Sequence, residues 1–252
     1  MFYLNFLTEV HRRLQPRAYL EIGIRHGNSL ALARCRTVGI DPAYVITAEI
    51  DGDVALNRTT SDEYFSRPDP LSPTGGVPFD LSFIDGLHLF EFALRDFIFA
   101  ERYSAARGVI IFDDVLPRTV DEAARERHTV QWTGDVFWVL EVLHRYRPDL
   151  VVTPLHTQPT GLLAVYGLDP TNTVLTDNFG QILAEFRHAD PQPVPAELLD
   201  RLSVVSAGRF LDAGLLELLS EAHPDATATD LAADLNELTR RQFGHGFVLS
   251  SQ

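Results

Sequence analysis

Short apolar runs alternate with segments of helical periodicity through the first two thirds of the chain, and this alternation limits the folds that the sequence can adopt. Apolar runs typical of buried strands occupy residues 19–24, 37–41, 79–85 and 108–112, and a weaker run occupies 54–56. Apolar residues at helical spacing occupy 28–36, 61–66, 87–104 and 135–146. This alternation predicts a parallel sheet with helices on both of its faces.

The last two predicted strands, at 150–153 and 162–166, are joined by a short bend at Gly161. A short connection favours antiparallel pairing, because parallel neighbours need a long crossover. We therefore expect an α/β fold with a doubly wound, mostly parallel sheet and an antiparallel edge strand.

Beyond residue 170 the pattern changes to helical segments, at 181–188, 196–202 and 209–222. The expected organisation is therefore one domain over 1–170 followed by a C-terminal helical extension over 171–252. The extension would act as a lid or as an oligomer contact, and we expect a homodimer in the second case.

The charge balance narrows the range of partners. Lys and Arg total 21 and Asp and Glu total 35, so the net charge is −14. An acidic protein of this kind is not expected to bind nucleic acid or an anionic membrane surface. The single cysteine, Cys35, excludes an intramolecular disulfide and a cysteine zinc site. The first residues do not have the pattern of a signal peptide, and the expected location is the cytoplasm.

Acidic residues stand at the ends of the predicted strands. In an open α/β sheet, ligands bind beyond the carboxyl ends of the strands. The predicted strands bring five carboxylates to that edge, from Glu21, Asp41, Asp85, Asp113 and Asp114. We therefore expect the ligand site at this edge of the sheet.

The first strand ends in the pattern E-x-G-x-x-x-G, formed by Glu21, Gly23 and Gly27. The pyrophosphate fingerprint G-x-G-x-x-G is absent. Asp41 ends the next strand, where a carboxylate can accept hydrogen bonds from both ribose hydroxyls of a nucleoside. The alternative interpretation is a glycine turn and an aspartate that caps the chain before Pro42.

Asp85, Asp113 and Asp114 form a second group, because the ends of neighbouring strands lie about 4.8 Å apart. Clustered carboxylates repel one another, and oxygen ligands of this kind favour Mg²⁺ or a similar divalent cation. Asp113 and Asp114 can both reach one ion only if the chain leaves strand geometry there. The alternative is that they cap a segment or lie in a solvated loop. His88 follows Asp85 by three residues, and a neutral imidazole there would accept a proton from a substrate hydroxyl.

Three segments carry a resemblance to a known family: 19–42 (YLEIGIRHGNSLALARCRTVGIDP), 79–96 (FDLSFIDGLHLFEFALRD) and 108–115 (GVIIFDDV). They resemble the class I S-adenosylmethionine-dependent methyltransferases, which have a Rossmann-like fold. The detailed pattern is similar to the metal-dependent sugar O-methyltransferases of the macrocin and mycinamicin type. The resemblance covers about residues 15–170.

The resemblance implies a role for each matching residue. The cofactor-binding residues would be Glu21, Gly23, Gly27 and Ser29 at the methionine end, Asp41 at the ribose, and Ser61 and Asp62 at the adenine. The metal ligands would be Asp85, Asp113 and Asp114. His88, next to Asp85, would be the general base. Gly134 and Asp135 would bind the acceptor or begin a helix. Independently of the resemblance, Trp132, Phe137 and Trp138 would either stack on a sugar or an aromatic ring or pack in the core.

The function expected from the sequence is an S-adenosylmethionine- and Mg²⁺-dependent O-methyltransferase. Its acceptor would be a small molecule or an oligosaccharide, with the methyl group transferred to a sugar or glycoside hydroxyl, as in a polysaccharide precursor or a glycosylated natural product. A phenolic or catechol acceptor is an alternative, because two adjacent oxygens also chelate a metal. Further alternatives are an NAD-dependent oxidoreductase or epimerase, a non-catalytic binding protein on the same fold, and a metal-dependent hydroxylase-like relative.

Overall fold

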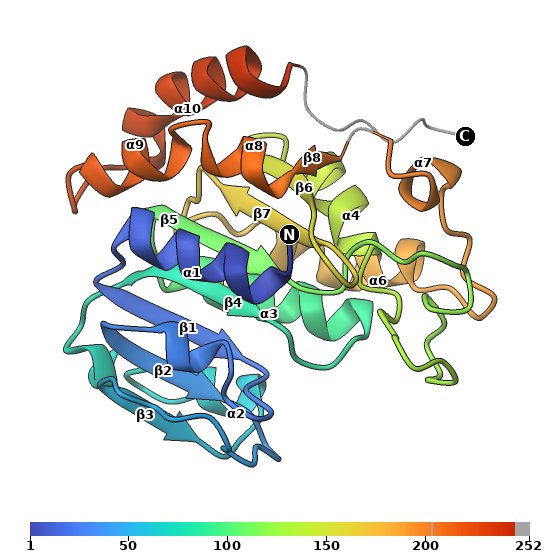
Figure 1. Ribbon diagram of the computed structural model, residues 1–252, viewed down its shortest axis with the longest axis horizontal. Helices are drawn as coiled ribbons and strands as arrows, with labels where there is room; N and C mark the ends of the chain where they lie inside the picture. Colours follow the sequence, from blue (N-terminus) through green and yellow to red (C-terminus); the bar gives the residue numbers. More distant parts are fainter. Residues whose placement is uncertain (203, 245–252) are drawn as a thin grey trace.

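A computed structural model describes residues 1–202 and 204–244, and an eight-stranded sheet organises this part of the chain (Figure 1). The strands are β1 (Ala18–Ile22), β2 (Arg36–Ile40), β3 (Val54–Asn57), β4 (Phe79–Ile84), β5 (Ser104–Phe112), β6 (Val151–His156), β7 (Leu162–Tyr166) and β8 (Val205–Ser206). Their order in the sheet is β3-β2-β1-β4-β5-β7-β6-β8.

The strand directions confirm the predicted fold class. β1 pairs in parallel with β2 and β4, and the parallel part continues to β3 on one side and β5 on the other. The antiparallel strand is β7, which lies between β5 and β6 and not at the edge of the sheet where it was expected. The sheet then extends beyond β7 to β6 and to β8, which runs parallel to β6. β8 has two residues, too few to produce a strand pattern in the sequence.

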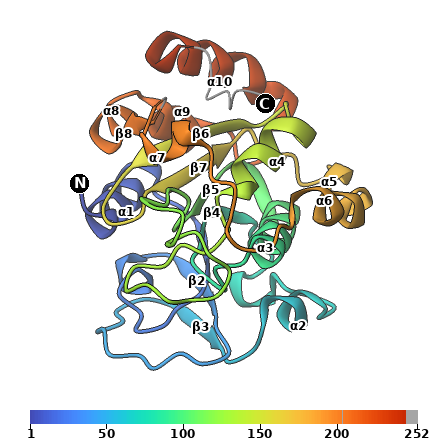
Figure 2. The same ribbon diagram turned by 90° about the vertical axis from the view of Figure 1, so that its right-hand side faces the viewer.

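Helices cover both faces of the sheet (Figure 2). They are α1 (Tyr3–Leu14), α2 (Ser61–Phe65), α3 (Phe90–Arg102), α4 (Trp138–Tyr146), α5 (Val174–Asp177), α6 (Phe179–Phe186), α7 (Ala196–Leu199), α8 (Ala207–Leu211), α9 (Leu215–Glu221) and α10 (Ala228–Phe243). The short 3₁₀ turns are η1 (Leu30–Leu32) and η2 (Ser72–Thr74). Among the described residues, no helix is both long enough and apolar enough to cross a membrane.

Three helices, α1, α5 and α10, were not expected from the sequence, and two of them have clear signals in it. α1 buries Phe6, Leu7, Val10 and Leu14 on one side, which is a helical spacing. α10 begins with a capping box, in which the Thr227 side chain accepts from the backbone N–H of Asp230 and the Asp230 side chain accepts in return. Both signals are present in the sequence. The apolar residues of α1 have helical spacing, and T-x-x-D before the apolar pattern of α10 marks the start of a helix.

The helix predicted over 28–36 is wrong. Only the 3₁₀ turn Leu30–Leu32 forms, and Ala33 is already extended, with ψ at 140°. The Ser29 hydroxyl donates to the Glu21 carboxylate and makes no cap for a helix. β2 begins at Arg36, so the connection is too short for a longer helix.

The C-terminal third shares its cores with the sheet. Phe210 of α8 and Leu215 of α9 are buried in the same core as Phe6 of α1. On the other face, Ile182 and Phe186 of α6 belong to the core that contains α3 and α4. Residue 170 therefore does not separate two cores in the described part of the chain. Residues 203 and 245–252 of the predicted extension lie outside the described residues.

A buried carboxylate ties the sheet to the α9 layer. Asp80 on β4 is fully buried and accepts hydrogen bonds from the side chains of Arg17 and Arg107. Arg107 also donates to the carbonyls of Ser220 and Ala222 at the end of α9. Burial raises the pKa of Asp80, but the hydrogen bonds from the two arginines outweigh it and hold the pKa below its usual value.

We expect Asp80→Ala to lower the free energy of unfolding by about 3–5 kcal/mol, because it leaves the buried Arg107 guanidinium without its carboxylate. Urea denaturation measures this difference. Asp51→Ala is the control, since Asp51 is exposed and should change stability little. A loss at Asp80 no larger than that at Asp51 would contradict the structural role.

Candidate active site

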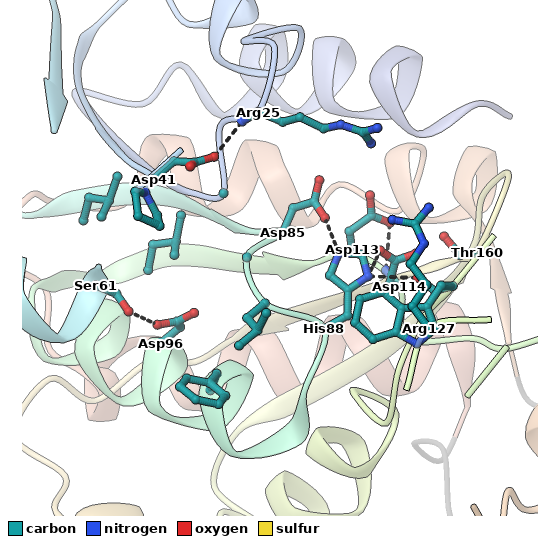
Figure 3. Close-up of a pocket in the computed structure, with 18 of the residues that line it drawn as sticks. Arg25, Asp41, Ser61, Asp85, His88, Asp96, Asp113, Asp114, Arg127 and Thr160 are labelled. Atoms are coloured by element: carbon teal, nitrogen blue, oxygen red, sulfur yellow. Dashed lines mark hydrogen bonds and ion pairs between the residues drawn. The ribbon is translucent and has the colours of Figure 1, made fainter. Parts of the chain in front are cut away.

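A cavity of about 720 Å³ opens at the carboxyl ends of β1, β2, β4 and β5 (Figure 3). It is lined by eight of the site residues expected from the sequence: Gly23, Asp41, Ser61, Asp62, Asp85, His88, Asp113 and Asp114. The structure therefore brings most of these residues to one place. Three others, Glu21, Gly27 and Ser29, do not line the cavity.

Glu21 lies behind the cavity wall. Its side chain is fully buried, and its carboxyl group accepts hydrogen bonds from the Tyr19 hydroxyl at 2.6 Å and the Ser29 hydroxyl at 2.8 Å. Burial raises the pKa of Glu21 to about 8. Gly27 has a φ of +82° and packs against Ile46, 3.1 Å from the position of an added Cβ. Glu21, Ser29 and Gly27 therefore stabilise the loop after β1 through contacts inside the protein and not through the cavity surface.

Gly23 brings the loops after β1 and β4 into contact. Its φ is +91°, and a Cβ at this position would lie 1.9 Å from the carbonyl oxygen of Asp85. The backbone N–H of Asp85 in turn donates to the carbonyl of Ile22 at 2.8 Å. The glycine is therefore required by this close approach of the backbone as well as by its φ.

Asp41 occupies the end of β2 and organises the neighbouring loop. One carboxylate oxygen accepts from the backbone N–H groups of Ile24 at 3.0 Å and Arg25 at 2.8 Å. The other accepts from the N–H of Ala43 at 2.6 Å. Asp41 thus lines the cavity while its carboxylate accepts hydrogen bonds from three backbone N–H groups (Figure 3).

The segment expected at the adenine contacts a residue that the sequence did not single out. The Ser61 hydroxyl donates to Oδ1 of Asp96, which is almost fully buried and also lines the cavity. Burial raises the pKa of Asp96 to about 7. Asp62 instead forms an ion pair with Arg95 at 3.0 Å and is 42% exposed. Asp96 was missed because it lies inside a helical pattern, where an acidic residue ordinarily marks the solvent face.

His88 lies between two carboxylates. Its Nε2 is 3.3 Å from Oδ1 of Asp85, and its Nδ1 is 3.1 Å from Oδ2 of Asp114. One ligand atom from each of these three residues falls within 4.8 Å of the others. Burial lowers the pKa of His88, but the hydrogen bond to Asp85 and the charges of Asp114 and Asp85 outweigh it and raise the pKa to about 9.

Asp113 and Asp114 differ in their positions. Asp114 has a φ of +59°, so the chain leaves strand geometry immediately after β5, as a shared site requires. Oδ1 of Asp113 accepts from the N–H of Asp114 at 2.8 Å, and Asp113 is not part of the group around His88. Burial and the charges of Asp114 and Asp85 raise the pKa of Asp113 well above its usual value. Two of the three expected metal ligands are therefore grouped with His88, and the third lies beside them.

The segment 122–135 holds His88 from the other side. The Trp132 carbonyl lies 2.9 Å from Nδ1 of His88, and the two rings stack with centroids 5.0 Å apart at 17°. A Cβ at Gly134 would lie 1.7 Å from the His88 carbonyl oxygen. Asp135 accepts from the N–H of Phe90 at 2.7 Å. Trp132 therefore packs on the histidine, while Gly134 and Asp135 join this segment to the start of α3.

Residues 20–115 match a family model described as "Methyltransferase domain". Residues 20–115 are thus similar to a methyltransferase domain, and this match agrees with the expected enzyme class. It covers Gly23, Asp41, Asp85, His88, Asp113 and Asp114. No curated protein matches the chain.

Solved structures with a similar arrangement include two O-methyltransferases. One is TomG from Streptomyces achromogenes, involved in tomaymycin synthesis and in complex with SAM, at 18% identity over 65% of this chain and 78% of that chain, with a TM-score of 0.48. Another is the O-methyltransferase from Bacillus cereus in complex with SAH, at 18% identity over 65% of this chain and 79% of that chain, with a TM-score of 0.48.

We expect Gly23→Ala to destabilise the protein much more than Gly76→Ala. Both glycines have positive φ, but nothing lies within 4 Å of a Cβ at Gly76, whereas the Gly23 Cβ would overlap the Asp85 backbone. The left-handed conformation costs about 1–2 kcal/mol in each variant, and the overlap adds to this only at Gly23. Thermal unfolding of both variants measures the difference. Equal losses of stability in the two variants would mean that the loops after β1 and β4 can move apart at Gly23 without a cost in free energy.

Proposed function

We propose that the protein is an S-adenosylmethionine- and divalent-metal-dependent O-methyltransferase that acts on a hydroxyl group of a sugar or glycoside. The observation that carries this proposal is a single cavity with two chemically distinct parts. A nucleoside-type part contains Gly23 and Asp41, and an acidic part contains Asp85, His88 and Asp114. The methyltransferase domain match over 20–115 supports the reaction class.

The acidic part fits a divalent cation. Asp85 and Asp114 each place a carboxylate oxygen within reach of one point, and burial raises the pKa of Asp114 to about 6. Carboxylates held this closely favour a hard cation that offsets their repulsion. Asp85 and Asp114 would hold the metal, with His88 and Asp113 beside it. The oxygen-rich donor set favours Mg²⁺ over zinc.

The proposed roles divide between the bound groups and the protein side chains. When bound, S-adenosylmethionine would supply the methyl group, and the cation would lower the pKa of an acceptor hydroxyl. Asp41 would bind the ribose hydroxyls. A cation held by Asp85 and Asp114 would offset the charges that raise the pKa of His88, and the neutral imidazole would then accept the hydroxyl proton at Nε2, because Nδ1 faces the carbonyl of Trp132. The loops joined at Gly23 would hold donor and acceptor in line, and this alignment supplies much of the rate.

A phenolic or catechol acceptor is the second candidate, and the cavity rim favours it. Phe2, Leu87 and Val130 line the cavity, and they are 45%, 52% and 92% exposed. Apolar side chains at an open site suit a ligand with an apolar ring. Both candidates would use the same chemistry at the metal. They differ in the part of the acceptor that carries the reacting hydroxyl, which is a sugar in one case and an aromatic ring in the other.

We expect methyl transfer from S-adenosylmethionine to be abolished by excess EDTA and restored by Mg²⁺. A panel of glycosides and catechols, assayed with and without the metal, tests both candidates. Turnover of glycosides alone supports the sugar acceptor, and turnover of catechols alone supports the second candidate. Full activity in excess EDTA would contradict the role of the metal.

We expect His88→Gln to lower kcat by about 10²–10⁴-fold with little change in the affinity for S-adenosylhomocysteine, because the side chain would act on the acceptor proton. Asp41→Asn should show the opposite pattern, with affinity for S-adenosylhomocysteine reduced. Calorimetry and steady-state kinetics on both variants separate the two roles. Loss of cofactor affinity in His88→Gln would instead make His88 a structural residue.

A further inference from the structure

We infer that Asp96 is the residue that recognises the base of the nucleoside, by accepting a hydrogen bond from its exocyclic amino group. This inference rests on the proposed function, which places an adenine-containing cofactor in the cavity. It also moves base recognition away from Asp62, the carboxylate that the sequence favoured.

The first observation is a half-satisfied buried carboxylate. Asp96 is 4% exposed, yet it lines the cavity. Oδ1 accepts from the Ser61 hydroxyl, whereas Oδ2 accepts no hydrogen bond from any residue that the structure describes. Oδ2 is not one of the fully enclosed polar atoms without a partner, so it is open to the cavity and can accept from a ligand that brings an N–H group.

The second observation is the space around Oδ2. A Cβ at Gly86 would lie 3.3 Å from this oxygen, so the missing side chain at Gly86 keeps Oδ2 accessible. Gly86 also lines the cavity, directly after Asp85 at the end of β4. The open side of the carboxylate therefore faces the loop between the nucleoside-type part and the acidic part (Figure 3).

The third observation is the apolar surroundings. Phe92 lies one helical turn before Asp96 on α3 and lines the same cavity, as do Leu87, Ile40 and Pro42. Ile40 and Pro42 flank Asp41, the proposed ribose ligand. Apolar walls beside an open carboxylate oxygen suit a flat ring that carries an amino group.

Asp62 is less suited to this role. It pairs with Arg95 at 3.0 Å, and its side chain is 42% exposed. A carboxylate that already has a cationic partner and faces solvent discriminates weakly between ligands. An acceptor without a protein partner, on a side chain that is otherwise enclosed, discriminates strongly, because a ligand that lacks the donor displaces water from the oxygen and leaves it unsatisfied.

The test compares two ligands and two proteins by calorimetry. The ligands are S-adenosylhomocysteine and S-inosylhomocysteine, in which a carbonyl oxygen replaces the amino group. We expect the unaltered protein to bind the adenosyl ligand at least about 100-fold more tightly, since the inosyl oxygen would face Oδ2 of Asp96. In Asp96→Asn the amide can donate to that oxygen, and the preference should fall below about 10-fold.

Glu101→Gln is the matched control. Glu101 lies on the same helix and is also buried, but it pairs with Arg147 and does not line the cavity. This variant should retain the full preference for the adenosyl ligand. Thermal unfolding of each variant shows whether it is folded, and the ligand comparison in the unaltered protein does not depend on any variant.

Three outcomes would overturn the inference. Equal binding of both ligands by the unaltered protein would exclude recognition of the amino group by any residue. A strong preference that persists in Asp96→Asn would assign recognition to another group. Binding of neither ligand would contradict the proposed cofactor itself, which is a different failure from a misassigned residue.

Discussion

The parallel register of the four central strands is the constraint on which the cavity depends. Ile22 of β1 is paired with Ile40 of β2 and Ile84 of β4, and Ile84 is paired with Phe112 of β5. The residues that follow these four are Gly23, Asp41, Asp85 and Asp113. Because parallel strands end at the same edge, one aligned row of strand ends produces the wall of the site. A shift of one residue in any strand would turn its terminal side chain to the other face of the sheet.

Electrostatics at this edge follow from burial more than from the overall acidity of the chain. Most carboxylates that make up the net charge of −14 lie on the surface, where water screens them. Asp113 and Asp114 are enclosed by the sheet and the segment 122–135, and burial is the largest cause of their raised pKa values. His88 is held in the same enclosure by the carbonyl and ring of Trp132. The fold thus gathers carboxyl groups whose charged forms are disfavoured by burial, and the proposed cation would offset this cost.

Much of the site was predictable because strand ends are visible in the sequence. An apolar run that stops at an acidic residue marks both the strand and its terminal side chain, and Asp41, Asp85 and Asp113 were located in this way. Glu21 was also found, but its side chain turns inward to Tyr19 and Ser29. Periodicity along one strand does not show whether a polar side chain faces a ligand or a buried partner, since both environments require hydrogen bonds.

The sequence by itself determined the alternation of strands and helices, the acidic strand ends and the close spacing of Asp85 and His88. These features depend on neighbours along the chain, so local patterns record them. Only the tertiary structure decided that Asp96 reaches Ser61, that Trp132 packs on His88, and that α8 and α9 share a core with α1. Each of these contacts joins segments that are distant in the chain, and their formation depends on how the layers pack around the sheet.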